Sequence, residues 1–188
     1  METWKAIPGY EGIYEVSDQG NVRSVDRRDF SGARRTGRAI NPFTTDRGYL
    51  QVELNKCGEG RKHLVHRLVL TAFVGPCPEG MVGCHFNDVG TDNRLENLRW
   101  DTPRANTYDS IRLGTNKETR KTHCKWGHVL KMPNLKPGGL EYGHRQCLAC
   151  GRARNYIYTR KHLEPHFLAI ADEKYHEIMT KEGSQSTH

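Results

Sequence analysis

The span CHFNDVGTDNRLENLRWDTPRAN, residues 84–106, constrains the fold more than any other part of this chain. Its histidine, His85, precedes a loop rich in asparagine, aspartate and glycine, and such a loop reverses the chain direction. Apolar residues return at 95–100, and Thr102-Pro103 is typical of an N-cap followed by proline at the first helical position. We therefore expect a strand, a loop, a second strand and a helix, which together direct His85 and Asn106 toward one small space.

The segments HRLVLTAFVGPCPEG (66–80), ENLRW (96–100) and TPRAN (102–106), taken with His85, resemble the HNH nuclease module of phage-type homing endonucleases. The resemblance implies a ββα-metal fold that binds one divalent ion, Mg²⁺ or Mn²⁺. It implies that His85 acts as general base on water, that Asn97 fixes the loop and orients His85, and that Asn106 binds the metal. Histidine titrates near neutral pH and can accept a proton from water, and a hard cation can stabilise charge on the phosphate and on the leaving oxygen.

The sequence leaves the second protein ligand of this ion open. Related enzymes often have aspartate immediately before the first histidine, and this chain has Cys84 there. Asp109 follows Asn106 by three residues and shares its helical face, which makes it the first candidate. Cys84 is a soft ligand and comes second, and Asp88 in the loop comes third. A shell completed by water and the DNA phosphate is the remaining alternative.

Residues 1–56 are expected to form a β-rich module. Apolar residues surround the turn-rich sequences PGYEG and SDQGN, and residues 14–25 are typical of a β-hairpin. WKAIPGYEGIYEVSDQGNVRS, residues 4–24, resembles the DNA-binding motif at the start of many phage HNH homing enzymes. The alternative is a small β unit that only packs on the nuclease.

An arginine-rich segment follows, RRDFSGARRTGR at residues 27–38. It is too polar to pack into a core and flexible enough to follow a DNA groove. Guanidinium groups bind phosphates in a bidentate manner and can read guanine edges. An exposed, solvated loop is the alternative. The DNA-binding candidates are Arg23, Arg27, Arg28, Arg34, Arg35 and Arg38.

Residues 48–74 are expected to form two strands and a helix. GYLQVEL at 48–54 alternates apolar and polar residues like a half-buried strand, and residues 56–62 are predicted to form a turn before another strand. LVHRLVLTAFV at 64–74 has apolar residues at helical spacing. We interpret His66, within this helix, as a structural or phosphate-contacting residue, because no neighbour in the sequence completes a site.

A second metal motif follows a polar, basic linker at residues 115–123. Cys124 and His128 form one pair of donors, and Cys147 and Cys150 form another. Two such pairs can close a tetrahedral shell, which is typical of structural Zn²⁺. Similar fingers accompany phage HNH nucleases, and four unligated residues are the alternative. In so small a module, zinc would supply much of the folding free energy.

The C-terminal part is predicted to be helical from residue 151 onward. In the helix expected at 163–179, a stripe of Leu168, Ala171, Tyr175 and Ile178 can be buried, and a polar tail follows. The sequence leaves open whether this helix docks on the nuclease, pairs with a second copy or packs on the finger.

The charge of the chain favours a polyanionic partner. Its net charge is +7 and its arginines are clustered, which is typical of nucleic-acid-binding modules. The sequence has no apolar run of membrane-spanning length and no signal peptide, so we expect a soluble, cytoplasmic protein, in a bacterial host if a phage encodes it. In that compartment the six cysteines are expected to be metal ligands or free thiols.

These observations predict an α+β protein of small modules: a β-rich DNA-binding module at 1–56, a ββα-metal HNH nuclease at 57–114, a linker and zinc finger at 115–162, and a helix and tail at 163–188. The expected function is site-specific, divalent-metal-dependent cleavage of double-stranded DNA, without membrane association. The alternative is a DNA-binding or phage packaging accessory protein with a weakened nuclease site, which Cys84 favours. An RNA-binding finger protein would leave the nuclease motif unexplained. Target sequence, nicking versus double-strand cleavage and oligomeric state stay open.

Overall fold

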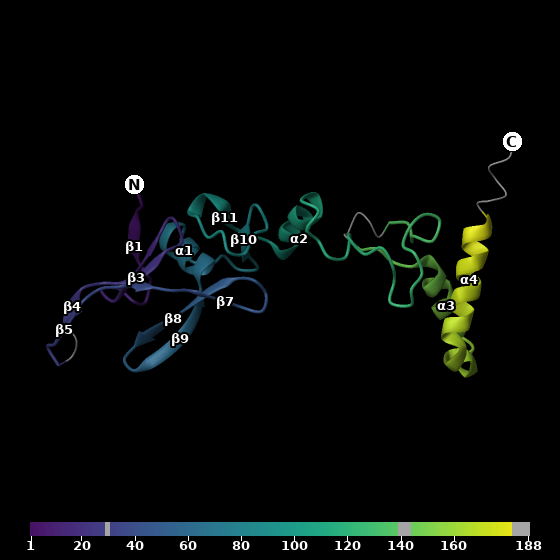
Figure 1. The fold of residues 1–188 in the computed structure, drawn as a ribbon, viewed down its shortest axis with the longest axis horizontal. Coiled ribbons are helices and arrows are strands. Elements are labelled where there is room, and N and C mark those ends of the chain that lie inside the picture. Colours follow the sequence, from purple (N-terminus) through teal and green to yellow (C-terminus); the bar gives the residue numbers. More distant parts are fainter. Residues whose placement is uncertain (29–30, 139–143, 182–188) are drawn as a thin grey trace. The chain divides into compact units, whose positions relative to one another are not determined.

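The structure is a computed structural model that describes residues 1–28, 31–138 and 144–181. It divides into two compact units, Met1–Asp109 and Ser110–His188 (Figure 1). The named strands all lie in the first unit, and helices occur in both, so the predicted α+β class is confirmed. The polar tail expected at the C-terminus lies outside the described residues.

The N-terminal sheet consists of short antiparallel strands in the order β1-β2-β3-β6. The hairpin predicted at residues 14–25 is confirmed, and Gly20 in its turn has a φ of +83°, a conformation that glycine adopts without steric cost. The strands are β1 (Trp4–Ala6), β2 (Tyr14–Ser17), β3 (Val22–Ser24) and β6 (Ala39–Ile40).

The arginine-rich segment forms a two-stranded antiparallel ribbon. β4 (Arg27–Arg28) pairs with β5 (Arg34–Arg35), so that Arg27 faces Arg35 and Arg28 faces Arg34. The segment is therefore more regular than its composition indicated. Backbone pairing does not require apolar side chains, which is why the lack of hydrophobic residues did not exclude it.

A three-stranded sheet and a helix follow. β7 (Phe43–Thr44), β8 (Leu50–Lys56) and β9 (Glu59–Leu64) pair in that order, and α1 (Val65–Phe73) begins directly after β9. The predicted strand and helix are confirmed, but the turn predicted at 56–62 is too long. Only two residues, Cys57 and Gly58, form the connection, and both have positive φ as a tight hairpin requires.

The strand-loop-strand-helix order predicted around His85 is confirmed. β10 (Val82–His85) pairs antiparallel with β11 (Leu98–Asp101), and a 3₁₀ turn, η1 (Leu95–Asn97), leads into β11. α2 (Pro103–Arg112) begins where expected, and the Ala105 N–H donates to Thr102 Oγ1 at 3.2 Å as the N-cap interaction requires.

One hydrophobic core joins the N-terminal sheet to the β10–β11 hairpin. Helix α1 lies between them and contacts β1, β2, β8, β9, β10 and β11. Because both parts are buried against the same helix, their loops are held at fixed positions relative to each other. The buried core residues are Ile7, Tyr10, Tyr14, Val16, Val22, Val52, Leu54, Val65, Leu68, Val69, Leu70 and Leu98.

The second unit contains the finger loops and two packed helices, α3 (Leu148–Tyr158) and α4 (Phe167–Lys181). α3 begins before the predicted residue 151, because Cys147 is its N-cap and its Sγ accepts a hydrogen bond from the Cys150 N–H. A 3₁₀ segment, η3 (Lys161–His166), contains Pro165 and delays the start of α4 relative to the prediction.

Helix α4 packs along α3 within this unit (Figure 1), in agreement with the alternative that it packs on the finger. Ala171 and Ile178 are buried and Tyr175 is partly buried, as predicted, whereas Leu168 is exposed. Leu168 shares the helical face of Ala171 but lies in the first turn of α4, which begins at Phe167. Within the described residues, no helix is long and apolar enough to cross a membrane.

Candidate functional site

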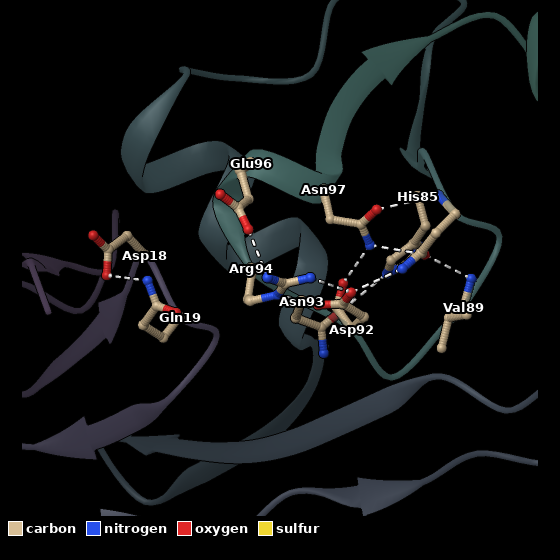
Figure 2. Close-up of polar contacts among 10 residues, drawn as sticks. Asp18, Gln19, His85, Val89, Asp92, Asn93, Arg94, Glu96 and Asn97 are labelled. Atoms are coloured by element: carbon tan, nitrogen blue, oxygen red, sulfur yellow. Dashed lines mark hydrogen bonds and ion pairs between the residues drawn. The ribbon is translucent and has the colours of Figure 1, made fainter.

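His85 lies at the end of β10 and is buried (Figure 2). Its Nε2 is 3.1 Å from Asn93 Oδ1, and the ring is only 6% exposed. The Tyr49 ring stacks on it at 5.9 Å with an interplanar angle of 24°, and the His66 ring meets it edge-on at 5.1 Å. These contacts fix both the position and the orientation of the imidazole.

The loop between β10 and β11 is held by Asn97. Its Nδ2 donates to Asn87 Oδ1 at 2.9 Å and to the Asp92 carbonyl at 2.8 Å, and its Oδ1 accepts from the Asn87 N–H at 3.1 Å. Asn97 thus makes the loop-fixing contacts expected of it. The side chain that accepts a hydrogen bond from the His85 ring is Asn93 instead, a residue that the sequence did not single out because the loop contains several asparagines.

An ion pair closes the same loop (Figure 2). Arg94 donates from Nε to Asp92 Oδ1 and from a terminal nitrogen to Oδ2, both at 2.9 Å, and it also binds Glu96 at 2.6 Å. The hydrogen bonds from Arg94 hold the pKa of Asp92 at about 2. Asp92 is therefore ionised at neutral pH and stays available as an acceptor for Asn87 Nδ2.

His66 lies closer to the candidate site than the sequence suggested. Besides its contact with the His85 ring, it packs against Gly83, where a Cβ would come within 2.8 Å of His66 Cδ2. Burial, together with the charges of His85 and Arg67, lowers the pKa of His66 to about 4. A neutral His66 can pack on His85 without opposing a positive charge on that ring, so it is part of the wall of this site.

The candidate ligands of the catalytic ion lie on α2, on β10 and in the loop that follows β10. Asn106 and Asp109 are both half-buried on α2, and Asp109 accepts a hydrogen bond from Arg99. Cys84 lies opposite Arg99 in the strand register and is 1% exposed, and burial raises the pKa of its thiol. Asp88, in the loop, has a φ of +57°. The donor set therefore offers amide and carboxylate oxygens, which suit Mg²⁺ or Mn²⁺, more readily than a thiolate.

The four finger residues converge on one point in the second unit. His128 Nδ1 lies 3.6 Å from Cys124 Sγ, 3.6 Å from Cys147 Sγ and 3.3 Å from Cys150 Sγ. Cys124 Sγ and Cys150 Sγ are 3.9 Å apart. A tetrahedral ion with Zn–S of about 2.3 Å and Zn–N of about 2.0–2.1 Å needs edges of roughly 3.6 Å between N and S and 3.8 Å between two S atoms. These four distances match the edges of a zinc shell, and all four donor atoms lie within 4.8 Å of one another.

The histidine of this cluster is oriented by helix α4. His128 Nε2 donates to Asp172 Oδ1 at 2.8 Å, and the His128 ring stacks on Tyr175 at 4.7 Å with an interplanar angle of 20°. This arrangement leaves Nδ1 directed at the three sulfur atoms. A carboxylate behind a metal-binding histidine fixes its tautomer and raises its basicity. Burial and the neighbouring thiols raise the pKa of Cys150, as expected where sulfur atoms crowd around a cation position.

Comparison with known proteins identifies the family. A family model described as the NUMOD4 motif matches residues 2–55, and one described as an HNH endonuclease matches residues 63–108. The DNA endonuclease I-HmuI of Bacillus phage SP01 is 34% identical over 135 residues, which cover 71% of this chain and 69% of that protein. This chain belongs to the HNH homing endonucleases. The predicted family and enzyme class are confirmed.

Two further comparisons support this HNH homing endonuclease assignment. YosQ of Bacillus subtilis (strain 168), named as an SPbeta prophage-derived putative HNH homing endonuclease, is 33% identical over 73 residues, 38% of this chain and 42% of that protein. A solved structure describing DNA binding and cleavage by I-HmuI aligns at 35% identity with a TM-score of 0.50, and the match covers 60% of each chain. Neither family model extends beyond residue 108, so the zinc-finger assignment depends on the geometry of the four donor residues alone.

The predicted DNA-binding arginines of this HNH homing endonuclease lie in the region matched by the NUMOD4 motif. Most of them line a cavity of about 940 Å³ between the β4–β5 ribbon, Arg38 and the β8–β9 turn. Arg23 lies elsewhere: it binds Glu15 at 2.6 Å, and its guanidinium stacks over the Trp4 ring at 4.0 Å. Arg23 therefore has protein partners away from this cavity. In the ribbon, Arg34 pairs with Asp26 at 3.6 Å and Arg28 donates to the Gly32 carbonyl at 3.0 Å, and both arginines line the cavity.

Proposed function

We propose that this HNH homing endonuclease hydrolyses double-stranded DNA at a specific site in a reaction that depends on Mg²⁺ or Mn²⁺, with His85 as the general base. The observation that carries the proposal is the hydrogen bond between His85 Nε2 and Asn93 Oδ1. An amide oxygen can only accept, so Nε2 must carry the proton. The Nδ1 lone pair is then the basic site of the ring.

An imidazole held in this tautomer can take a proton from water through Nδ1. The stacked Tyr49 ring and the edge-on His66 ring restrict rotation of His85, so that the lone pair keeps one direction. Asn97 contributes through the loop, since it holds the segment that carries Asn93.

Asn106 would hold the catalytic ion, and Asp109 is the first candidate for a second ligand. When bound, the ion would supply Lewis-acid stabilisation of charge on the phosphate and the leaving oxygen. Asp109 offers a hard, anionic oxygen, and Arg99 keeps it directed toward β11. Cys84 ranks second, because burial favours its protonated thiol and because thiolates prefer softer ions.

The β4–β5 ribbon supports binding to the DNA backbone. Its two cross-strand pairs are both arginine against arginine, and like charges directly opposite each other destabilise a ladder. A phosphate chain in the adjoining cavity would remove this repulsion, and guanidinium groups bind phosphate oxygens in a bidentate manner. The ribbon thus has a charge arrangement that a polyanion would stabilise.

The finger is proposed to bind one structural Zn²⁺ through Cys124, His128, Cys147 and Cys150. The support is the near-tetrahedral spacing of the four donor atoms. Its position beside α3 and α4 gives zinc a structural role in the second unit, where it would contribute to folding.

Cleavage of supercoiled plasmid DNA in Mg²⁺ and in Mn²⁺ tests the catalytic proposal. His85→Ala should slow cleavage by about 10²–10⁴-fold, the usual contribution of a general base, while leaving DNA affinity unchanged. His123→Ala, at an exposed position in the second unit, is the control and should cleave like wild type. Comparable cleavage by His85→Ala and wild type would remove His85 from the mechanism.

The alternative function is a DNA-binding or packaging accessory protein with a weakened nuclease, and Cys84 in place of the usual aspartate is the observation in its favour. The same plasmid assay separates the two. Wild-type protein that binds DNA tightly and leaves it intact in both metals would support the accessory role.

A further inference from the structure

We propose that the hairpin turn at residues 17–20 of the N-terminal motif positions the general base, because Gly20 in this turn supports Asn93, which holds the His85 ring. Gly20 and Asn93 are positioning residues in this scheme and do not touch the substrate. The proposal rests on the proposed role of His85. It gives the NUMOD4 motif a second task, next to the DNA contact proposed above.

Asn93 is the first link. It is 3% exposed, and its Oδ1 makes the hydrogen bond to His85 Nε2. Its Nδ2 is buried and has no hydrogen-bond partner within the residues that the structure describes. A buried amide nitrogen without a partner lowers folding stability. An apolar side chain would fill this position at less cost, so the value of the asparagine lies in its oxygen, which faces the catalytic ring.

Gly20 is the second link. Its φ is +83°, and a Cβ built there would lie 2.7 Å from Asn93 Cβ and 3.0 Å from the Asn93 carbonyl oxygen. Only a residue without a side chain allows the two backbones to approach this closely. A backbone hydrogen bond from the Leu95 N–H to the Asp18 carbonyl, at 2.7 Å, connects the same turn to the residues that follow Asn93.

Hydrogen bonds to the Ser17 and Asp18 side chains also hold the turn in place. Ser17, which is fully buried, accepts hydrogen bonds through Oγ from the Gln19 and Asn21 N–H groups at 3.2 and 3.0 Å. Asp18 Oδ1 accepts from the Thr3 N–H at 3.1 Å. A displacement at Gly20 therefore cannot be absorbed by the turn alone and must move Asn93 as well.

The expected effect of Gly20→Ala follows from these distances. Carbon atoms in ordinary contact are about 3.5–4.0 Å apart, so the 2.7 Å separation would have to open by about 1 Å. A displacement of about 1 Å at a catalytic group can cost roughly 10²-fold in rate. We expect single-turnover cleavage by Gly20→Ala to slow by about that factor, with DNA affinity unchanged.

Gly9→Ala is a matched control in the same motif. Gly9 has a φ of +84°, nearly the same backbone conformation, but a Cβ there would have no atom within 4 Å. It carries the same backbone strain without the contact to Asn93. Both variants should lose thermal stability through backbone strain, Gly20→Ala the more because of its contact with Asn93, and only Gly20→Ala should lose the cleavage rate.

Variants at Asn93 test the first link without changing the turn. In ¹⁵N NMR spectra of the full-length protein, the wild-type His85 ring should show the tautomer with hydrogen on Nε2. Asn93→Asp keeps an acceptor oxygen and should retain this tautomer. Asn93→Leu keeps the approximate volume but removes the acceptor, and should give mixed tautomers and cleavage slower by at least about tenfold.

The outcomes distinguish the positioning role of Gly20 and Asn93 from the role of His85 as general base. Equal cleavage rates for Gly20→Ala and Gly9→Ala, or a pure Nε2–H tautomer with wild-type rate in Asn93→Leu, would refute the positioning role while His85→Ala stays inactive. Normal cleavage by His85→Ala would instead refute the proposed function, and the positioning role with it.

Discussion

Replacing Asp172 tests whether helix α4 tunes the finger's affinity for zinc. The Asp172 carboxylate accepts a hydrogen bond from His128 Nε2 at 2.8 Å. Loss of such a carboxylate behind a metal-binding histidine typically weakens metal affinity by about 10–100-fold. The Asp172 side chain is 50% exposed, so water screens its charge and can replace part of its hydrogen bond.

We therefore expect the lower end of this range. Asp172→Ala removes both charge and acceptor and should weaken zinc binding about tenfold, equivalent to about 1.4 kcal/mol. Asp172→Asn keeps a neutral acceptor oxygen, so it should lose about half that free energy, or roughly threefold in affinity. Zinc affinity should therefore decrease from wild type to Asp172→Asn to Asp172→Ala, because the first substitution removes the charge and the second removes the acceptor as well.

Competition with a chromogenic zinc chelator at equilibrium measures these affinities. Glu173→Gln is the control, because Glu173 is the next acidic residue on α4, is 66% exposed, and pairs with Lys174 at 3.7 Å rather than with a ligand. It removes the same charge from the same helix. Indistinguishable zinc affinities for Asp172→Ala and Glu173→Gln would show that general charge, and not the contact with His128, sets the affinity.

The other predictions concern the remaining sites. Cys147→Ser should abolish stoichiometric zinc in elemental analysis and expose residues 110–181 to limited proteolysis, whereas Cys77→Ser, at an exposed position, should change neither. Asp109→Ala should reduce cleavage in Mg²⁺ far more than Cys84→Ala, and the reverse order would identify a thiolate ligand. Replacing both arginines of β5 with alanine should flatten the slope of log affinity against log salt by about 0.9 for each phosphate that these arginines neutralise, and an unchanged slope and footprint would show that the ribbon does not touch DNA.

Local sequence patterns predicted the elements that depend on nearby residues. The hairpin at 14–25, helix α1 and the strand-loop-strand-helix order around His85 follow from apolar spacing and from Thr102 and Pro103, and the structure has them all. The convergence of the two finger pairs could also be predicted, because two short-spaced pairs of Cys and His ligands are typical of one tetrahedral Zn²⁺ site.

Contacts between distant parts of the chain could not be predicted in this way. The pairing of β4 with β5 depends on backbone geometry that polar composition neither favours nor excludes. The position of His66 against His85, and of Gly20 against Asn93, depends on how two hairpins dock on α1. Nothing in the loop sequence distinguishes Asn93 from Asn87, because each is an asparagine in a turn-rich segment.

The hydrophobic core shared by the N-terminal sheet, α1 and β11 limits how this enzyme can be recombined with its relatives. A chimera joined between residues 55 and 63, where the two family matches end and begin, would place foreign side chains on the side of α1 that faces the N-terminal sheet and would separate Gly20 from Asn93. Substitutions intended to change the DNA target are better made in the β4–β5 ribbon, because its residues do not belong to that core. Because the two motifs share one core, they are best exchanged together as a single unit.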